Sequence, residues 1–164
     1  MAKEPKKLED LFHDTLKDIY FAERKILTAI PKMAKAAQSD QLRAAFEKHH
    51  AETEGQVERL EQVFGLIGKK AHGKTCDAIV GIVEEGQEVM KEYKGSPALD
   101  AGLLAGAQAV EHYAISRYGT LKTWADELGL RDAVRLLDAT LQEEKKTDAT
   151  LTRIAESVVN KEAA

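Results

Sequence analysis

Apolar residues recur every three or four positions along most of the chain, the spacing at which side chains share one face of a helix. Glycines at positions 68, 95 and 129 interrupt this pattern, and glycine commonly follows the last residue of a helix. The pattern predicts five helices, at about residues 8–37, 39–67, 75–93, 97–128 and 130–160.

The lengths of the connections predict how these helices are arranged. Very short links join the first two helices and the last two, and short links make neighbouring helices antiparallel. The longer connection between the two hairpins carries the short third helix. We therefore predict an all-α fold, an antiparallel four-helix bundle of two long hairpins with one extra helix in the crossover. One domain spans residues 1–164, with flexible ends at 1–7 and 161–164.

Three of the predicted helices carry acidic residues within an otherwise apolar stripe. Glu23 is the exception in the stripe of the first helix, and Glu111 is the exception in a stripe of the fourth. Glu144 and Asp148 occupy consecutive stripe positions on the fifth helix, whereas Glu143 lies off the stripe and is expected at the surface. A buried acid costs free energy unless it is paired, protonated or bound to a cation.

The second helix offers two alternative sets of inward residues. Glu47 and His50 form an E-x-x-H pair, the spacing found in di-iron carboxylate bundles. The alternative is His49 with Glu52, and periodicity alone does not choose between the pairs. Depth favours Glu52, because Glu23 precedes the first interhelical turn by fifteen residues and Glu52 follows it by fourteen.

The second hairpin repeats this match in depth. Glu111 lies eighteen residues before Gly129 and Glu144 lies fifteen after it, so the acids of both hairpins are expected in one layer. A layer of carboxylates with a nearby histidine suits two metal ions. Such ligands favour iron, with manganese as the alternative, over copper(I) and over structural zinc, which prefers thiolates. The chain has a single cysteine, Cys76, and therefore no thiolate cluster.

Composition excludes several classes of function. The 164 residues carry a net charge of −4 without a basic stripe, so nucleic acid is not an expected partner. No apolar run reaches the roughly 18 residues of a membrane span, so a membrane is not expected either. The charged N-terminal sequence has no apolar segment typical of a signal peptide, and one cysteine fits a reducing compartment. A cytoplasmic location is therefore expected.

Several motifs occur in a fixed order along almost the whole chain. They are D-x-Y-x-A-E at 18–23, H-x-x-E-T-x-G-Q at 49–56, V-E-H-Y followed by Y-G-T within 110–120, and T-L-x-E-E-K-x-T-D at 140–148. With these motifs the chain resembles the YciF-like bacterial stress proteins, a branch of the ferritin-like superfamily. The resemblance implies a ferritin-like, rubrerythrin-like di-iron bundle, a homodimer with the short helix at its interface, and a role in stress.

The resemblance also bears on the ligands. It implies that His49 and Glu52 are kept while positions 47 and 50 vary, which favours the same pair as the depth comparison. One departure concerns the last helix, where a standard di-iron bundle has an E-x-x-H pair and this chain has Glu144 and Asp148. With fewer imidazole ligands, the redox potential and the metal preference stay open.

Two functions are consistent with these residues. In the first, two metal ions are bound by Glu23, His49, Glu52, Glu111, Glu144 and Asp148. Glu52 and Glu144 would bridge or chelate, Glu23 and Glu111 would bind terminally, and the other two would complete the ligand sets. The protein would then oxidise Fe(II) or reduce peroxide or dioxygen. In the second, it is a non-enzymatic dimeric stress scaffold with a structural or vestigial metal site.

The orientation of the remaining polar residues follows from the same reasoning. His49, Glu52 and Gln56 are expected to face inward, and Glu47 and Glu54 to face water. Tyrosine hydroxyls are expected to bind carboxylates from packed positions, at Tyr20, Tyr113 and Tyr118. The sequence leaves open the roles of Gln56, Glu84 and His112 and the geometry of the dimer.

Overall fold

The computed structural model describes residues 3–164, and over this range the chain is helical without strands. The main helices are α1 Leu8–Ala36, α2 Asp40–Leu66, α3 Asp77–Glu92, α4 Leu99–Glu127 and α5 Arg131–Ile154. A π-helical turn, η1 Ala155–Val159, leads into the short α6 Asn160–Ala163. Each predicted helix is present, with ends that differ by up to two residues for the first four. The flexible end predicted for residues 1–7 falls partly on residues 1–2, which lie outside the described residues.

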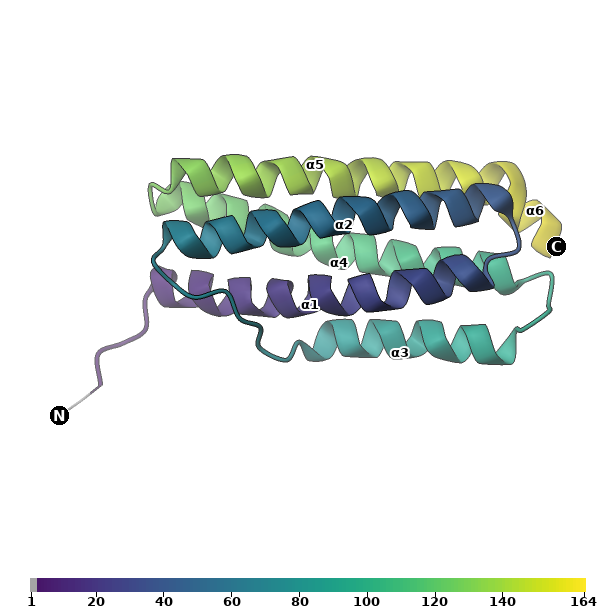
Figure 1. The fold of residues 1–164 in the computed structure, drawn as a ribbon, viewed down its shortest axis with the longest axis horizontal. Helices are drawn as coiled ribbons and strands as arrows, with labels where there is room; N and C mark the ends of the chain where they lie inside the picture. The colour runs from purple at the N-terminus through teal and green to yellow at the C-terminus, as the bar shows by residue number, and fades with distance from the viewer. Residues whose placement is uncertain (1–2) are drawn as a thin grey trace.

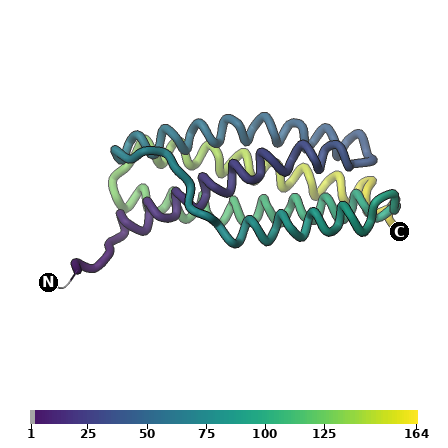
Figure 2. The backbone as a smooth tube through the Cα atoms, turned by 60° about the horizontal axis from the view of Figure 1, so that its bottom comes forward, coloured from purple at the N-terminus to yellow at the C-terminus, as the bar shows by residue number. Residues whose placement is uncertain are grey.

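The four long helices form an antiparallel bundle, as predicted. Helix α1 packs against α2 and α4, and α5 packs against the same two helices. Figures 1 and 2 show that each helix runs opposite to the neighbours it contacts in the bundle. The crossover from α2 returns along the outside of α1 and carries α3 back to the start of α4. None of the helices in the described part of the chain is long and apolar enough to cross a bilayer.

Helix α3 packs its apolar face against its own bundle. Ile79 and Val83 are buried, and Ile82, Val89 and Met90 pack against the same core. The contacts of α3 are with α1 and α4. The sequence alone left open whether this face meets the same chain or a second one, and the structure assigns it to the same chain. The homodimer implied by the resemblance stays a prediction.

A buried aspartate ties the first hairpin to the second. Asp100, in the first turn of α4, is 7% exposed and accepts hydrogen bonds from the backbone N–H groups of Gln38 and Ser39, at 2.8 and 2.6 Å. Ser39 in turn caps α2, because its hydroxyl oxygen accepts the N–H of Leu42 at 3.4 Å. The short turn between α1 and α2 is thereby fixed to the start of α4.

Helix α5 differs from the prediction at its C-terminal end. Continued at the same spacing, the stripe of the predicted fifth helix would bury Val158, but Val159 is the buried residue, with 1% exposure, and Val158 is only half-buried. The cause is the π-helical turn at Ala155–Val159, which adds a residue to one turn and so shifts the inward face. A strict alternation of three and four residues does not anticipate that shift.

Candidate metal centre

Each long helix contributes one acidic or histidine side chain to a cluster in the middle of the bundle. The residues are Glu23 from α1, His49 from α2, Glu111 from α4 and Glu144 from α5, with exposures of 1%, 4%, 0% and 2%. All four follow the apolar stripe of their helix, so the same helical spacing that builds the core also turns them inward. The structure therefore confirms that Glu23, Glu111 and Glu144 are buried.

Three of these residues meet closely enough to share one ion. His49 Nδ1 lies 3.0 Å from Glu111 Oε1, and His49 Nε2 lies 4.0 Å from Glu144 Oε1. One ligand atom from each of the three residues lies within 4.8 Å of the others. Taken as ionised groups, both carboxylate oxygens of Glu111 and Oε1 of Glu144 lack a hydrogen-bond donor, whereas a protonated Glu111 can share a hydrogen bond with Glu144. The 3.0 Å separation is therefore a close approach without the geometry of a hydrogen bond.

Burial sets the protonation of this cluster. Desolvation, a hydrogen bond with Glu144 and the charge of Glu144 together raise the pKa of Glu111 to about 12. Desolvation also raises the pKa of Glu23 well above its ordinary value, and the charge of Glu144 adds to that effect. The pKa of His49 is lowered by its burial, although neighbouring carboxylates oppose this. The imidazole is thus favoured in its neutral form, which is the form that binds metals.

Glu23 is held by a buried tyrosine. The hydroxyl of Tyr118 donates a 2.7 Å hydrogen bond to Glu23 Oε1, and the tyrosine side chain is fully buried. Tyr20 similarly donates to Glu61 Oε1 at 2.9 Å. These two bonds confirm the prediction of tyrosine–carboxylate pairs. Tyr113 departs from it, because its hydroxyl lies 2.9 Å from the Cys76 thiol instead.

Glu52 lies at the edge of the cluster. Its side chain is 23% exposed, and its oxygens contact Lys48 Nζ at 3.6 Å and accept a hydrogen bond from the Thr147 hydroxyl at 3.2 Å. The inward position one residue further along α2 belongs to Thr53, whose hydroxyl donates to the His49 carbonyl at 2.7 Å. The structure therefore does not bring Glu52 into the close set of three.

Asp148 also lies at the edge, with 22% exposure of its side chain. Its Oδ1 is 3.1 Å from His112 Nε2 and 3.3 Å from Gln108 Nε2. His112 is itself 69% exposed, so it contacts Asp148 from the surface and not from the buried cluster.

The alternative pair on α2 does not join the cluster. Glu47 is exposed and His50 is half-buried, whereas His49 and Gln56 are buried. The predicted inward orientation of His49 and Gln56 is confirmed, as is the exposure of Glu47 and Glu54. Burial of His49 thus agrees with the pair His49 and Glu52 over the pair Glu47 and His50, but Glu52, the acid that the depth comparison placed in the layer, lies at its edge.

An ion pair that the sequence pattern did not predict lies beside the cluster. Glu143, predicted at the surface, is only 28% exposed, and Arg59 grips both of its oxygens, at 2.9 and 2.6 Å. Gln56 Nε2 donates to the same carboxylate at 3.1 Å. Glu143 is only partly exposed because it faces α2, where Arg59 and Gln56 bind its carboxylate. The positive charge of Arg59 was the one sequence signal for this ion pair.

The donor set fits a metal ion. A neutral imidazole and a carboxylate with two unpaired oxygens lie together in the core, where unpaired polar atoms are costly. A cation bound between them would satisfy these oxygens and remove the repulsion among the acids. Oxygen and imidazole ligands without thiolates suit iron or manganese.

Comparisons with known proteins agree with this fold. Residues 7–164 match the family described as Domain of unknown function (DUF892). Protein YciF of Escherichia coli strain K12 is 44% identical over 159 residues, which cover 96% of each chain. The crystal structure of the E. coli stress protein YciF matches with a TM-score of 0.91, covering 96% of this chain and 99% of that one.

Two further solved structures are similar. YcfI of Rhodopseudomonas palustris, a protein with a proposed structural role, is 44% identical, with a TM-score of 0.87 and coverage of 93% of this chain and 97% of that one. A protein of Xanthomonas campestris shares the fold at 19% identity, with a TM-score of 0.72 and coverage of 94% of both chains. From the family match over nearly its full length, the chain belongs to the DUF892 family.

Proposed function

We propose that this protein binds two metal ions, iron or alternatively manganese, in the middle of its bundle. During stress it would use them to oxidise Fe(II) or to reduce peroxide or dioxygen. The observation that carries the proposal is the unpaired Glu111 carboxylate beside His49 and Glu144. In the ionised form its two buried oxygens have no hydrogen-bond donor, which is costly in a core and which a bound cation would relieve. Similarity to an E. coli stress protein supports the cellular context.

The ligands would come from all four long helices. Glu23, His49, Glu111 and Glu144 would hold the ions from the buried side, and Glu52 and Asp148 would complete the ligand sets from the edge. Two bound ferrous ions would supply two electrons, which with two protons reduce dioxygen to hydrogen peroxide or hydrogen peroxide to two waters.

The surrounding residues would prepare the site. Tyr118 fixes the Glu23 carboxylate through its hydroxyl, and burial keeps the His49 imidazole neutral. Arg59 holds Glu143 outside the cluster, so that this additional carboxylate does not compete for the ions. The apolar core around the acids limits access of water, which strengthens electrostatic interactions between the ligands and an ion.

A specific observation also supports the non-enzymatic alternative. Because the pKa of Glu111 is raised to about 12, the bundle can keep this acid protonated and neutral without any metal. The protein would then serve as a scaffold, in keeping with the structural role proposed for its R. palustris relative. This alternative predicts a folded, metal-free protein without turnover.

Anaerobic titration of the metal-free protein with Fe(II), followed by exposure to dioxygen or peroxide, tests the proposal. We expect two irons per chain and an absorbance change on oxidation, both lost in Glu144→Ala and weakened in Glu52→Ala. Glu47→Ala, an exposed acid on α2, is the matched control and should behave like the parent. Absence of stoichiometric iron or manganese binding would contradict the proposal and leave the scaffold.

A further inference from the structure

An apolar pocket leads from the outside of the bundle to the candidate metal centre. It lies between α1, α3 and α4, and residues of α2 form its inner wall. Among its lining residues is His49, which is 4% exposed and belongs to the buried cluster. Within a single chain, the pocket therefore reaches from the groove beside α3 to a ligand of the proposed site.

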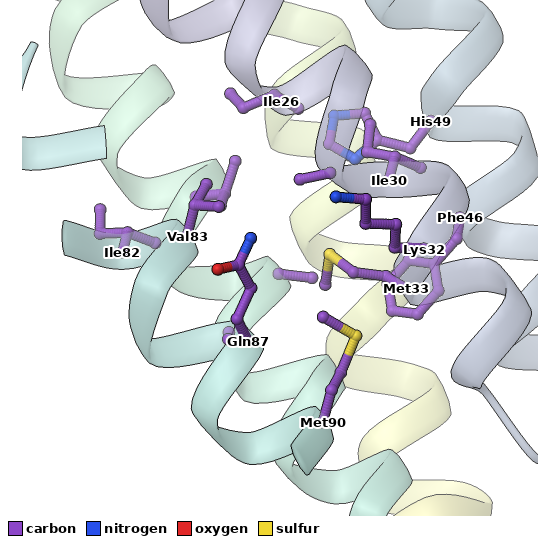
Figure 3. A pocket seen from close by; sticks show the side chains of 15 residues that line it. Ile26, Ile30, Lys32, Met33, Phe46, His49, Ile82, Val83, Gln87 and Met90 are labelled. Carbon is purple, nitrogen blue, oxygen red and sulfur yellow. The ribbon is translucent and has the colours of Figure 1, made fainter. Parts of the chain in front are cut away.

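The lining of this pocket is almost entirely apolar. The side chains with polar groups are Lys32, Gln87 and His49, and the first two are exposed residues, whereas His49 is buried. Figure 3 shows the side chains of Met33 and Met90 with their sulfur ends toward each other among the lining residues, on the side away from His49. Methionine side chains are flexible, so they can move aside for a small molecule.

Small residues keep the pocket open. A Cβ atom added at Gly86 on α3 or at Gly106 on α4 would meet nothing within 4 Å. Glycine is a poor helix former, and neither position requires it for close packing. The cavity has a volume of about 40 Å³. That is room for about three or four water-sized groups at roughly 10–15 Å³ each.

A second opening at His49 has a different character. It lies between α2 and α5, has a volume of about 20 Å³, and is lined by Lys48, Glu52, Lys146 and Thr147. Ions and molecules that form hydrogen bonds can bind to these polar side chains as they pass through this opening. In the apolar pocket they would lose their hydrogen bonds with water without replacement, which is unfavourable.

We propose that the apolar pocket between α1, α3 and α4 is the entry route for dioxygen to the metal centre. Dioxygen is small and uncharged and needs no hydrogen-bond partner, so it matches both the size and the lining of the pocket. Hydrogen peroxide, which carries two donors, is not favoured along it. This inference rests on the proposed function, because it assigns a substrate and its route to that site.

Xenon tests the pocket without any metal, because xenon occupies apolar cavities and is a probe for dioxygen. Crystals of the metal-free protein under xenon pressure should show xenon next to Met33 and Met90. The signal should disappear in Gly86→Leu and in Gly106→Leu, whose side chains fill the cavity. The proposal would be overturned if xenon bound only outside this pocket, or if xenon still bound in the pocket of both variants.

Oxidation kinetics test the route itself. In the Fe(II)-loaded protein, Gly86→Leu and Gly106→Leu should slow oxidation by dioxygen about tenfold. Oxidation by hydrogen peroxide and the stoichiometry of anaerobic Fe(II) binding should stay unchanged. Gly81→Leu is the matched control, because Gly81 is a half-buried α3 glycine with open space that does not line the pocket.

The outcomes separate this inference from the proposed function. Failure of the parent protein to bind iron would refute the proposed function, while xenon would still report on the pocket. Normal iron binding with dioxygen rates unchanged in both pocket variants would refute the route alone. Equal slowing with dioxygen and peroxide would contradict the selectivity for dioxygen.

Discussion

Glu111 combines complete burial with two carboxylate oxygens that, in the ionised form, no hydrogen-bond donor satisfies. A carboxylate in this position is either protonated or bound to a cation, because an isolated buried charge is very unfavourable. The negative charge of Glu144 raises the pKa of both Glu111 and Glu23, so ionisation of one of these acids opposes ionisation of the others. Protonation and metal binding are therefore mutually exclusive ways to stabilise the same cluster.

This competition predicts a pH dependence of the metal-free protein. An acid with a raised pKa in the folded state keeps a proton that the unfolded chain releases above about pH 4.5. Its contribution to stability is complete below that pH and is lost as pH rises toward the folded-state pKa, which for Glu111 is about 12. Between pH 7 and 8.5, the raised pKa values of Glu111 and Glu23 therefore make stability fall as pH rises.

We therefore expect the free energy of unfolding to fall between pH 7 and 8.5, by up to about 1.4 kcal/mol per pH unit for each such acid. Urea unfolding of metal-free protein measures this slope. Glu111→Gln should make it shallower. Glu143→Gln should not, because Arg59 and Gln56 lower the pKa of Glu143 and it is ionised in both states over this range. Equal slopes in the parent and Glu111→Gln would contradict the account.

Tyr118 provides a second test at the level of single residues. Tyr118→Phe removes the hydrogen bond to Glu23 inside the core and should destabilise the metal-free protein by about 1–3 kcal/mol. Tyr20→Phe is the matched control, because Glu61 is exposed and water can replace the lost bond. Chemical denaturation of both variants compares them. A smaller loss for Tyr118→Phe than for Tyr20→Phe would contradict the structural role of its hydroxyl.

The acidic stripe residues could be predicted because each interrupts a regular apolar pattern. Glu23, Glu111 and Glu144 needed only the helical period and the cost of burying a charge. Glu52 could not be placed so securely, because a helix turns by about 100° per residue. It therefore lies beside the inward position that Thr53 occupies. The partners of Glu143 depend on side-chain conformations across two helices, which no pattern within one helix encodes.

Among the elements, Asp100 is the residue that fixes the relative position of the two hairpins. It accepts the backbone N–H groups of Gln38 and Ser39 from a buried position. Asp100→Ala leaves both donors without this acceptor and should destabilise the protein by about 1–3 kcal/mol. Thermal unfolding measures the loss, and Asp77→Ala, at an exposed position in the first turn of α3, is the control. An unfolding temperature equal to that of the parent would contradict this role.

The helices themselves could be predicted from the period of apolar residues and from the glycines that follow them. Gly95 and Gly129 have φ angles of 77° and 71°, a conformation that other residues rarely adopt, so they mark real ends. The start of α4 was less predictable. Ser96 accepts the N–H of Ala98 at 3.1 Å and forms a turn there, and α4 begins only at Leu99. The π-helical turn after α5 has no comparable sequence signal.

At the scale of the whole molecule, a metal ion in the cluster would join helices from both hairpins. His49 belongs to the first hairpin, and Glu111 and Glu144 belong to the second. A ligand that binds only the folded state stabilises it, by about 2.7 kcal/mol at a free concentration one hundred times Kd. Anaerobic Fe(II) should therefore raise the unfolding temperature of the whole bundle.

Calorimetry of the protein with and without Fe(II) measures this stabilisation. It should be lost in Glu144→Ala and retained in Glu84→Ala, which removes an exposed acid on α3. Equal stabilisation of both variants would place the bound iron outside the bundle.

The bundle topology was predictable because its two hairpins have short links, whereas the contacts of α3 depended on the path of the crossover.

Anomalous diffraction at the iron absorption edge, from crystals of the Fe(II)-loaded protein, would show whether two metal ions bind inside the bundle. The account predicts two iron peaks per chain inside the bundle, one of them between His49, Glu111 and Glu144. Crystals of Glu144→Ala should lack these peaks. Iron bound only at the surface, or an empty core in crystals grown with excess Fe(II), would contradict the metal centre and favour the scaffold.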